Sequence, residues 1–506
     1  MLTSDRLLSA LHANWLLNAI GLVASFCASV VLVRAVPSAL FAQYSTVLAI
    51  IAVTTFVFES GANSGLTRYF HESSQHGARG TFYRRMQGRR AIGALLCSGA
   101  LIAGGPWYAK ATHFETLVGE PWLFTFIAAI VAATLLRLLA HYGLLALFEV
   151  RIALLLQQGF QIARALALAA VALAGGTLAQ IVMTLLVVAT IEAVLVHTAL
   201  WRQIRAERAP LPQGFIGRAQ TFGLFTILDK GCAMLGGGSV LLLVLAPHHP
   251  AATVALLGLA VDLVGKIVSV TVMPLGNLVA PYLSQTSEES GAQALAASRL
   301  TKFSSLLYCF SIGAGALLLP WFVPTVYGGE YVGAAWFALL MLLPSAFENW
   351  VRGCCSPVLL RNGRYRDVMR VNVLQAVVTL AVLSVAHRLP ISAALIAVGA
   401  VRASVAALNL AAMASIVPRG TYRVPLAVFA IAAVACLAAL ACGRAIPLPA
   451  SGRAVVQAVI FGASFYAGLR WLVFRDNDTL RLAHRIAGHR FKVFNMLLPA
   501  LRVSPE

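Results

Sequence analysis

Ionisable side chains occur in the middle of long apolar stretches of this sequence. A charged group inside a membrane span costs ~2.5–3.5 kcal/mol on insertion scales, so such groups usually face a protein interior or a water-filled path. They can bind charged or hydroxyl-bearing groups, or carry protons. The residues of this kind are Glu59, Arg137, His141, Arg164, Glu192, Asp229, Lys230, Asp262, Lys266, Glu348, Arg352 and Arg402.

Four of these residues form two pairs of opposite charge at i,i+4 spacing, Asp262 with Lys266 and Glu348 with Arg352. This spacing places both members of a pair on one helical face, where they neutralise each other and lower the cost of burial. The pairs are expected to line a cavity. The alternative is that they only hold neighbouring helices together.

Arg164 and Arg402 lie near mid-span with no local partner, which favours a position facing a cavity over one facing lipid. Glu192 and Asp229 lie nearer one end of their spans and could extend to the interface or pair there. Arg34 sits at a helix end and is expected at the outer interface.

The sequence therefore predicts a substrate cavity and a separate group of coupling or gating residues. The cavity residues are predicted to be Arg137, His141, Arg164, Asp262, Lys266, Glu348, Arg352 and Arg402, and the coupling or gating residues Glu59, Asp229 and Lys230.

The composition requires lipid around most of the chain. Its 506 residues are 60% hydrophobic and only 11% charged, and the mean hydropathy is +0.84. A soluble protein carries about 25% charged residues. The apolar runs are continuous rather than alternating, which predicts about 14 transmembrane helices of ~20 residues and no β-barrel. The expected fold is an all-α polytopic membrane protein.

The apolar runs divide into two groups of six and a final pair. The predicted spans are 11–34, 40–67, 91–110, 121–148, 152–174, 177–201, 222–246, 251–281, 302–323, 332–360, 369–387, 390–416, 424–443 and 453–474. Similar segments about 210 residues apart, VGEPWLFTF and GGEYVGAAWF, favour two parallel repeats. We expect a six-helix lobe at 1–201, a linker at 202–221, a second six-helix lobe at 222–416, two further helices within 417–474 and a basic amphipathic cytoplasmic tail at 475–506.

The net charge of +20 reflects topology rather than nucleic-acid binding. Lys and Arg gather in the predicted inner loops, first of all 68–90, while the outer turns are poor in them. This is the positive-inside pattern, and it predicts that both termini are cytoplasmic. No basic domain is large enough for a nucleic-acid face.

No enzyme signature is present. The sequence lacks a Walker A motif, a nucleophile elbow and a zinc signature, and the two histidines at 248–249 lie in a turn without a third ligand. We therefore expect no catalytic residue, no metal and no cofactor, with proton or sodium coupling left open.

Four stretches carry a resemblance to a known family: VLVRAVPSALFAQYSTVLAI, FESGANSGLTRYF, YGGEYVGAAWFALLMLLPSAFENW and VLLRNGRYRDVMRVNVLQAV. They resemble the Wzx-type polysaccharide flippases of the multidrug/oligosaccharidyl-lipid/polysaccharide (MOP) exporter superfamily. The resemblance spans about residues 10–420. The dipeptide FG, usual after the first turn of the family, is replaced here by FAQY at 41–44, which leaves the subfamily open.

The resemblance implies two six-helix lobes around a hydrophilic cavity and a bacterial inner-membrane location. It also implies movement of an undecaprenyl-diphosphate-linked oligosaccharide by alternating access, for O-antigen, exopolysaccharide or capsule synthesis, with polymerase and export machinery as further partners. A cation-coupled multidrug exporter of the same superfamily is an alternative. Others are an integral-membrane glycan polymerase or acyltransferase, for which His141 is the mid-span candidate, and a scaffold in an export complex.

Overall fold

The computed structural model describes residues 4–111, 120–147, 149–285, 290–361, 365–414, 416–418, 420–445 and 449–470. Within these ranges the regular structure is helical and contains no strand. The helices are α1 (Ser4–Ala35), α2 (Ser38–Gln75), α3 (Arg79–Ala111), α5 (Leu123–Ala146), α6 (Val150–Leu173), α7 (Leu178–Ile204), α8 (Phe215–Met234), α9 (Gly238–Leu245), η1 (Ala246–His248), α10 (Ala251–Gln285), α11 (Ser290–Val326), η2 (Gly329–Tyr331), α12 (Val332–Arg361), α13 (Tyr365–Ala386), α14 (Ile391–Met413), α15 (Arg423–Ala445) and α16 (Ala450–Gly468).

Many of these helices can cross a membrane. In the described part of the chain, 11 are long and apolar enough by length and composition to do so, and two shorter apolar helices, Ala19–Ala35 and Gly238–His248, accompany them. Large apolar side chains such as Leu95, Leu166 and Leu173 point outward, as expected of surfaces that face lipid. The expectation of an all-α polytopic membrane protein is confirmed.

The chain forms two compact units. Unit 1 comprises Met1–Lys266, Val323–Met341 and Met369–Arg402, and unit 2 comprises Ile267–Phe322, Leu342–Val368 and Ala403–Glu506. The division into lobes at 1–201 and 222–416 stays a prediction. The predicted tail at 475–506 lies outside the described residues.

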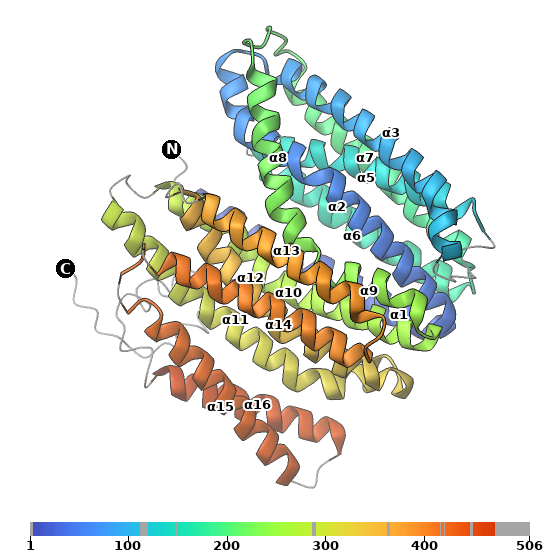
Figure 1. Ribbon diagram of the computed structural model, residues 1–506, viewed down its shortest axis with the longest axis vertical. Coiled ribbons are helices and arrows are strands. Elements are labelled where there is room, and N and C mark those ends of the chain that lie inside the picture. Colours follow the sequence, from blue (N-terminus) through green and yellow to red (C-terminus); the bar gives the residue numbers. More distant parts are fainter. Residues whose placement is uncertain are drawn as a thin grey trace. The chain divides into compact units, whose positions relative to one another are not determined.

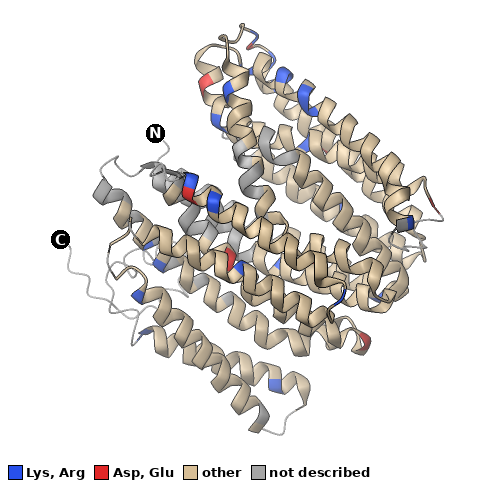
Figure 2. Ribbon diagram, viewed as in Figure 1, with Lys and Arg blue, Asp and Glu red and all other residues tan. Residues whose placement is uncertain are grey.

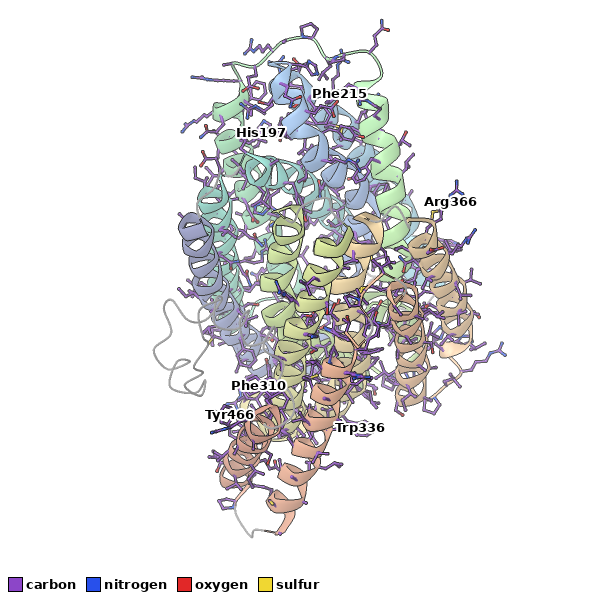
Figure 3. All side chains as sticks on the ribbon, turned by 90° about the vertical axis from the view of Figure 1, so that its left-hand side faces the viewer. His197, Phe215, Phe310, Trp336, Arg366 and Tyr466 are labelled. Atoms are coloured by element: carbon purple, nitrogen blue, oxygen red, sulfur yellow. The ribbon has the colours of Figure 1, made fainter. Side chains whose placement is uncertain are left out.

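Unit 1 is built around α2 and α5. Helix α2 packs against α3, α5, α8 and α9, α5 packs against α3 and α7, and α1 packs against α6 (Figure 1). One apolar cluster joins α2, α3, α5, α7 and α8 near the α2–α3 turn, with Phe70, Phe82, Tyr83 and Phe215 fully buried. His197 and Phe215 lie at this end of the unit (Figure 3). The cluster fixes the helices whose middle turns carry charged residues.

The described residues of unit 2 form two apolar clusters. Trp350 of α12 lies at the centre of one, packs edge-to-face against Phe429 and donates from Nε1 to Ser304 Oγ at 3.0 Å. The other holds α15 and α16 together through Phe461 and Phe465, whose stacked rings lie 5.6 Å apart (Figure 1). Phe310 of α11 contacts both of these rings, and it lies near Tyr466 (Figure 3).

The prediction of a loop at 68–90 is wrong, because this stretch is almost entirely helical. Helix α2 continues to Gln75, a turn contains Gly77 at φ +60°, and α3 begins at Arg79. Tyr69, Phe70, Phe82, Tyr83 and Met86 recur at helical spacing and pack into the apolar cluster, which outweighs the surrounding polar and glycine residues. Charged residues gather around this end of unit 1 (Figure 2), which we call the hairpin end.

The predicted span at 222–246 is also wrong as a single helix. It is divided into α8 and α9 at Leu235–Gly237. Three consecutive glycines, 236–238, weaken a helix by ~1 kcal/mol each relative to alanine. The side chain of Arg402 lies beside the break, with its Cγ 3.2 Å from the position that a Cβ on Gly236 would take.

Replacement of Gly65 by alanine is expected to destabilise unit 1. A Cβ at this position of α2 would lie 2.5 Å from the carbonyl oxygen of Ala219 on α8, so the two helices would have to separate. Overpacking of this kind costs ~1–3 kcal/mol. The measurement is thermal unfolding of the purified protein in detergent. Gly99→Ala on α3 is the matched control, since nothing lies within 4 Å of its Cβ, and an equal loss in both variants would contradict the prediction.

The hairpin end is held by an ion pair that responds to pH. Arg79 binds both carboxylate oxygens of Glu207, with its Nε 2.6 Å from Oε2, and Gly80 N donates to the Glu207 carbonyl at 2.9 Å. The hydrogen bond from Arg79 lowers the pKa of Glu207 below its usual value of 4.5. A carboxylate with a lowered pKa stabilises the fold above its unfolded pKa, and this stabilisation is lost as the pH falls through the folded pKa.

We therefore expect Glu207→Gln to lower the unfolding temperature at pH 7 by the equivalent of ~1 kcal/mol or less, as for a partly exposed ion pair. At about pH 3 the difference between the variant and the wild type should shrink, because this pH lies below the ordinary pKa of 4.5 and the unfolded chain is then favoured by protonation of Glu207. Unfolding temperatures measured at both pH values test this, and a difference independent of pH would contradict it.

Candidate functional site

A cavity of about 510 Å³ lies within unit 1. Its walls come mainly from α1, α2, α6 and α10, with two residues from α9 and one each from α5 and α7. The polar side chains that line it are Ser25, Ser29, Tyr44, Ser45, Arg137, Gln157, Gln161, Arg164, Ser239, Asp262 and Lys266.

Three helices each present one face to this cavity. On α6 the lining residues Gln157, Gln161, Arg164 and Leu168 recur every three or four positions. The same spacing recurs among the lining residues of α1 in the stretch 25–32 and of α10 in the stretch 258–266. The lining residues of α1 are mostly serine and alanine, and those of α10 begin with a glycine. Small residues permit close helix approach, and the long polar ones then reach into the space between.

Two arginines of the cavity wall share one carboxylate. Arg137 of α5 donates from Nη1 to Oε1 of Glu192 at 2.7 Å, and Arg164 of α6 donates from Nη2 to Oε2 at 3.0 Å. The Glu192 side chain is 2% exposed, and it comes from α7. A buried carboxylate is tolerated only with such partners, and the charged hydrogen bonds fix α5, α6 and α7 relative to one another.

The Asp262–Lys266 pair forms as its spacing predicts, with Nζ 2.6 Å from Oδ2. Asp262 also accepts a hydrogen bond from Ser29 Oγ at 2.8 Å, and Lys266 Nζ donates to the Ser25 carbonyl at 3.3 Å and lies 5.6 Å from the centre of the Phe26 ring. The pair therefore joins α10 to α1. Because both members line the cavity, joining the helices and lining the cavity are compatible here.

The cavity wall carries a moderate excess of positive charge. Among the residues the structure describes, the lining side chains include three cations, Arg137, Arg164 and Lys266, and one anion, Asp262. With Glu192 behind the arginines, these five groups have a net charge of +1 when all are ionised. Such a wall suits an anionic group that also offers hydroxyls to Gln157 and Gln161.

Three of the other predicted site residues lie elsewhere in the described part of the chain. His141 lies half-buried on α5, against Tyr142 and outside the lining of this cavity. Glu348 is buried in unit 2, and Arg402 lies by the α8–α9 break. The side chains of Arg352, Glu59, Asp229 and Lys230 lie outside the described residues. The roles predicted for all of these residues stay predictions.

Two arginines have partners on other helices that the sequence does not reveal. Arg164 has a partner, but it comes from α7 rather than from its own helix. Arg34 donates from Nε to the Val326 carbonyl at 2.7 Å and from Nη2 to the Thr325 carbonyl at 2.9 Å. These carbonyls end α11, where cations are favoured, so Arg34 caps a helix.

Sequence reasoning missed part of the site. The sequence places Glu192 near the end of its span, whereas in the structure it pairs with both arginines at the cavity wall. Gln157 and Gln161 are absent from the predicted site, although the pattern Q-x3-Q-x2-R on an apolar helix places three polar side chains on one face. That pattern could have identified the wall of α6 without a structure.

The fold and the cavity define a class. The chain is a multi-pass, all-α membrane protein, and its fold is similar to those of solved flippases and transporters of the MOP exporter superfamily. The lipid II flippase MurJ in an inward closed conformation superposes with a TM-score of 0.65 at 10% identity, covering 92% of this chain and 99% of that one.

Two transporters of the MATE type are also similar. A variant of VcmN from Vibrio cholerae gives a TM-score of 0.51 at 10% identity, over 84% of this chain and 100% of that one. The eukaryotic AtDTX14 gives a TM-score of 0.51 at 13% identity, over 84% and 98%. No family model and no curated protein matches the sequence. At these identities the likeness establishes the fold.

Proposed function

We propose that this protein is a flippase that moves an undecaprenyl-diphosphate-linked oligosaccharide across the bacterial inner membrane. The observation that carries the proposal is the cavity of unit 1, in which Arg137, Arg164 and Lys266 face a shared space in a chain with the MOP fold. The diphosphate and sugars enter the cavity, and the prenyl chain stays in lipid. The similarity to a solved lipid II flippase supports a lipid-linked cargo.

The residues of the wall have separate roles in this proposal. Arg164 and Lys266 bind the diphosphate or acidic sugars, since Arg and Lys are the usual partners of phosphate oxygens. Asp262 accepts hydrogen bonds from sugar hydroxyls or carries a coupling proton. Gln157 and Gln161 form hydrogen bonds with further hydroxyls. Arg352, Arg402 and Glu348 are proposed to contact the cargo during the transport cycle.

Topology and partners are part of the same proposal. The basic stretches at the hairpin end favour a cytoplasmic position for that end and for both termini. The proposed pathway is synthesis of O-antigen, exopolysaccharide or capsule, in which a polymerase and export machinery act after the flippase.

A transport role agrees better with the site than an enzymatic one. His141, which an acyltransferase or polymerase would need, does not line the described cavity. A cation-coupled drug exporter is the second candidate, because two MATE transporters share the fold and Asp262 is an acid within the wall. Resistance to cationic drugs on expression would favour that candidate.

The cellular test measures where the glycan accumulates. Spheroplasts with and without the protein are treated with a lectin or periodate that cannot cross the membrane. We expect the lipid-linked glycan to be accessible only when the protein is present. An unchanged sidedness, with an altered glycan length or acylation, would instead indicate an enzyme.

A further inference from the structure

The carboxylate of Glu192 lies behind the two arginines of the cavity wall and outside the cavity lining. It uses each oxygen for a different guanidinium, and with 2% of its side chain exposed it has almost no contact with solvent. Each arginine has five N–H donors and gives only one of them to Glu192. The arginines therefore keep donors for a second anion.

The two arginines are not equivalent. Arg137 lies 2.7 Å from the carboxylate with 19% of its side chain exposed, and Arg164 lies 3.0 Å from it with 37% exposed. The Nε atoms of both are buried and have no hydrogen-bond partner among the described residues. Arg164 therefore has the longer contact and the freer side chain, so it can exchange partners at lower cost.

We propose that Glu192 is a positioning residue that acts as an internal counter-anion. It holds Arg164 while the cavity is empty, gives it up to a phosphate oxygen of the cargo, and takes it back when the cargo leaves. This inference rests on the proposed function and adds a mechanism of release. With Glu192, the three cations Arg137, Arg164 and Lys266 and the two carboxylates Asp262 and Glu192 carry a net charge of +1. Without the charge of Glu192 the net charge would be +2, and a bound diphosphate would dissociate more slowly.

Inorganic pyrophosphate is the probe for a test with purified protein in a neutral detergent. The Glu192→Gln variant keeps the shape of the side chain but cannot neutralise two cations. We expect it to bind pyrophosphate about tenfold more tightly than the wild type, which corresponds to 1.4 kcal/mol. Glu192→Asp, which keeps the charge, should bind nearly as the wild type does. Binding by the Glu192→Gln variant that is equal to or weaker than wild type, or absent at millimolar concentrations, would overturn the proposal.

Transport kinetics separate positioning from a purely structural role. In flipping assays the Glu192→Gln variant should show a lower KM together with a lower maximal rate, because binding improves and release slows. Loss of rate with an unchanged or higher KM would contradict the proposal.

A second variant covers the case in which Glu192→Gln does not fold because the two arginines repel each other. The double variant Arg137→Gln with Glu192→Gln has the same net charge as the wild type, because it loses one cation and one anion. It also leaves no Glu192 carboxylate to compete with the probe for Arg164. It should bind pyrophosphate more tightly than the wild type, and weaker binding would overturn the proposal. Tight pyrophosphate binding without any glycan transport would reject the flippase while leaving the counter-anion role of Glu192 intact.

Discussion

Flipping by an Arg164→Ala variant should fall about tenfold to a hundredfold, with normal amounts of folded protein. The estimate corresponds to the loss of a hydrogen bond between charged groups, ~1.5–3 kcal/mol. Arg164 is the most exposed of the two arginines that share Glu192, and it lines the cavity. Folding is retained because Glu192 keeps its contact with Arg137 at 2.7 Å and is not left as an unpaired buried charge.

The measurement is the initial rate of flipping at equal protein content. Arg89→Ala is the matched control, since Arg89 is an exposed arginine of α3 outside the cavity and its loss should leave the rate unchanged. Arg164→Lys keeps a charge but loses the planar fork of donors, so an intermediate rate is expected. A wild-type rate in Arg164→Ala would remove this residue from the cargo site.

Replacement of Arg90 by methionine should destabilise the fold by ~1–3 kcal/mol, because a buried polar group loses its partner. Arg90 is 4% exposed and joins three helices. Its Nη2 donates to Asn63 Oδ1 of α2 at 2.9 Å, its Nη1 to the Phe58 carbonyl at 2.5 Å, and its Nε to the Leu135 carbonyl of α5 at 3.3 Å. The two carbonyls belong to helices, so Asn63 bears most of the loss.

A double-mutant cycle measures this contact. Asn63→Leu alone should also destabilise, and the variant with both Arg90→Met and Asn63→Leu should be more stable than the sum of the single losses predicts, with a coupling of ~1–3 kcal/mol. Unfolding temperatures in detergent provide the readout. Additive losses would show that the two side chains contribute independently, contrary to the geometry.

The helices of this protein follow from sequence where an apolar run is long and uninterrupted. The predicted spans at 390–416 and 177–201 differ by a few residues from the helices Ile391–Met413 and Leu178–Ile204, since burial and lipid both demand a continuous helix there. The predicted helix boundaries are wrong where the local composition does not match the structure. Polar residues at 68–90 suggest a loop, but four buried side chains and the partly buried Tyr69 pack into the apolar cluster and stabilise helix there. Three glycines at 236–238 interrupt a run that is otherwise apolar throughout.

The cavity was predictable only in part. The Asp262–Lys266 pair follows from helical spacing, because both partners lie on one helix. The Arg137–Glu192–Arg164 contacts could not be derived in the same way, since each residue comes from a different helix and the rotation of each helix depends on packing. Arg90 shows the same limit, because its membership of a basic stretch suggested a solvent-facing loop while its partners lie on α2 and α5.

Leaflet exchange of a lipid-linked glycan in proteoliposomes tests the central claim most directly. An undecaprenyl-diphosphate oligosaccharide carrying a fluorescent sugar is placed in both leaflets, and a quencher that cannot cross the bilayer is added outside. With wild-type protein, alone or under a proton or sodium gradient, the quenched fraction should rise from about half to nearly all, and Arg164→Ala should slow this rise. A fraction that stays at about half under all three conditions would contradict the account.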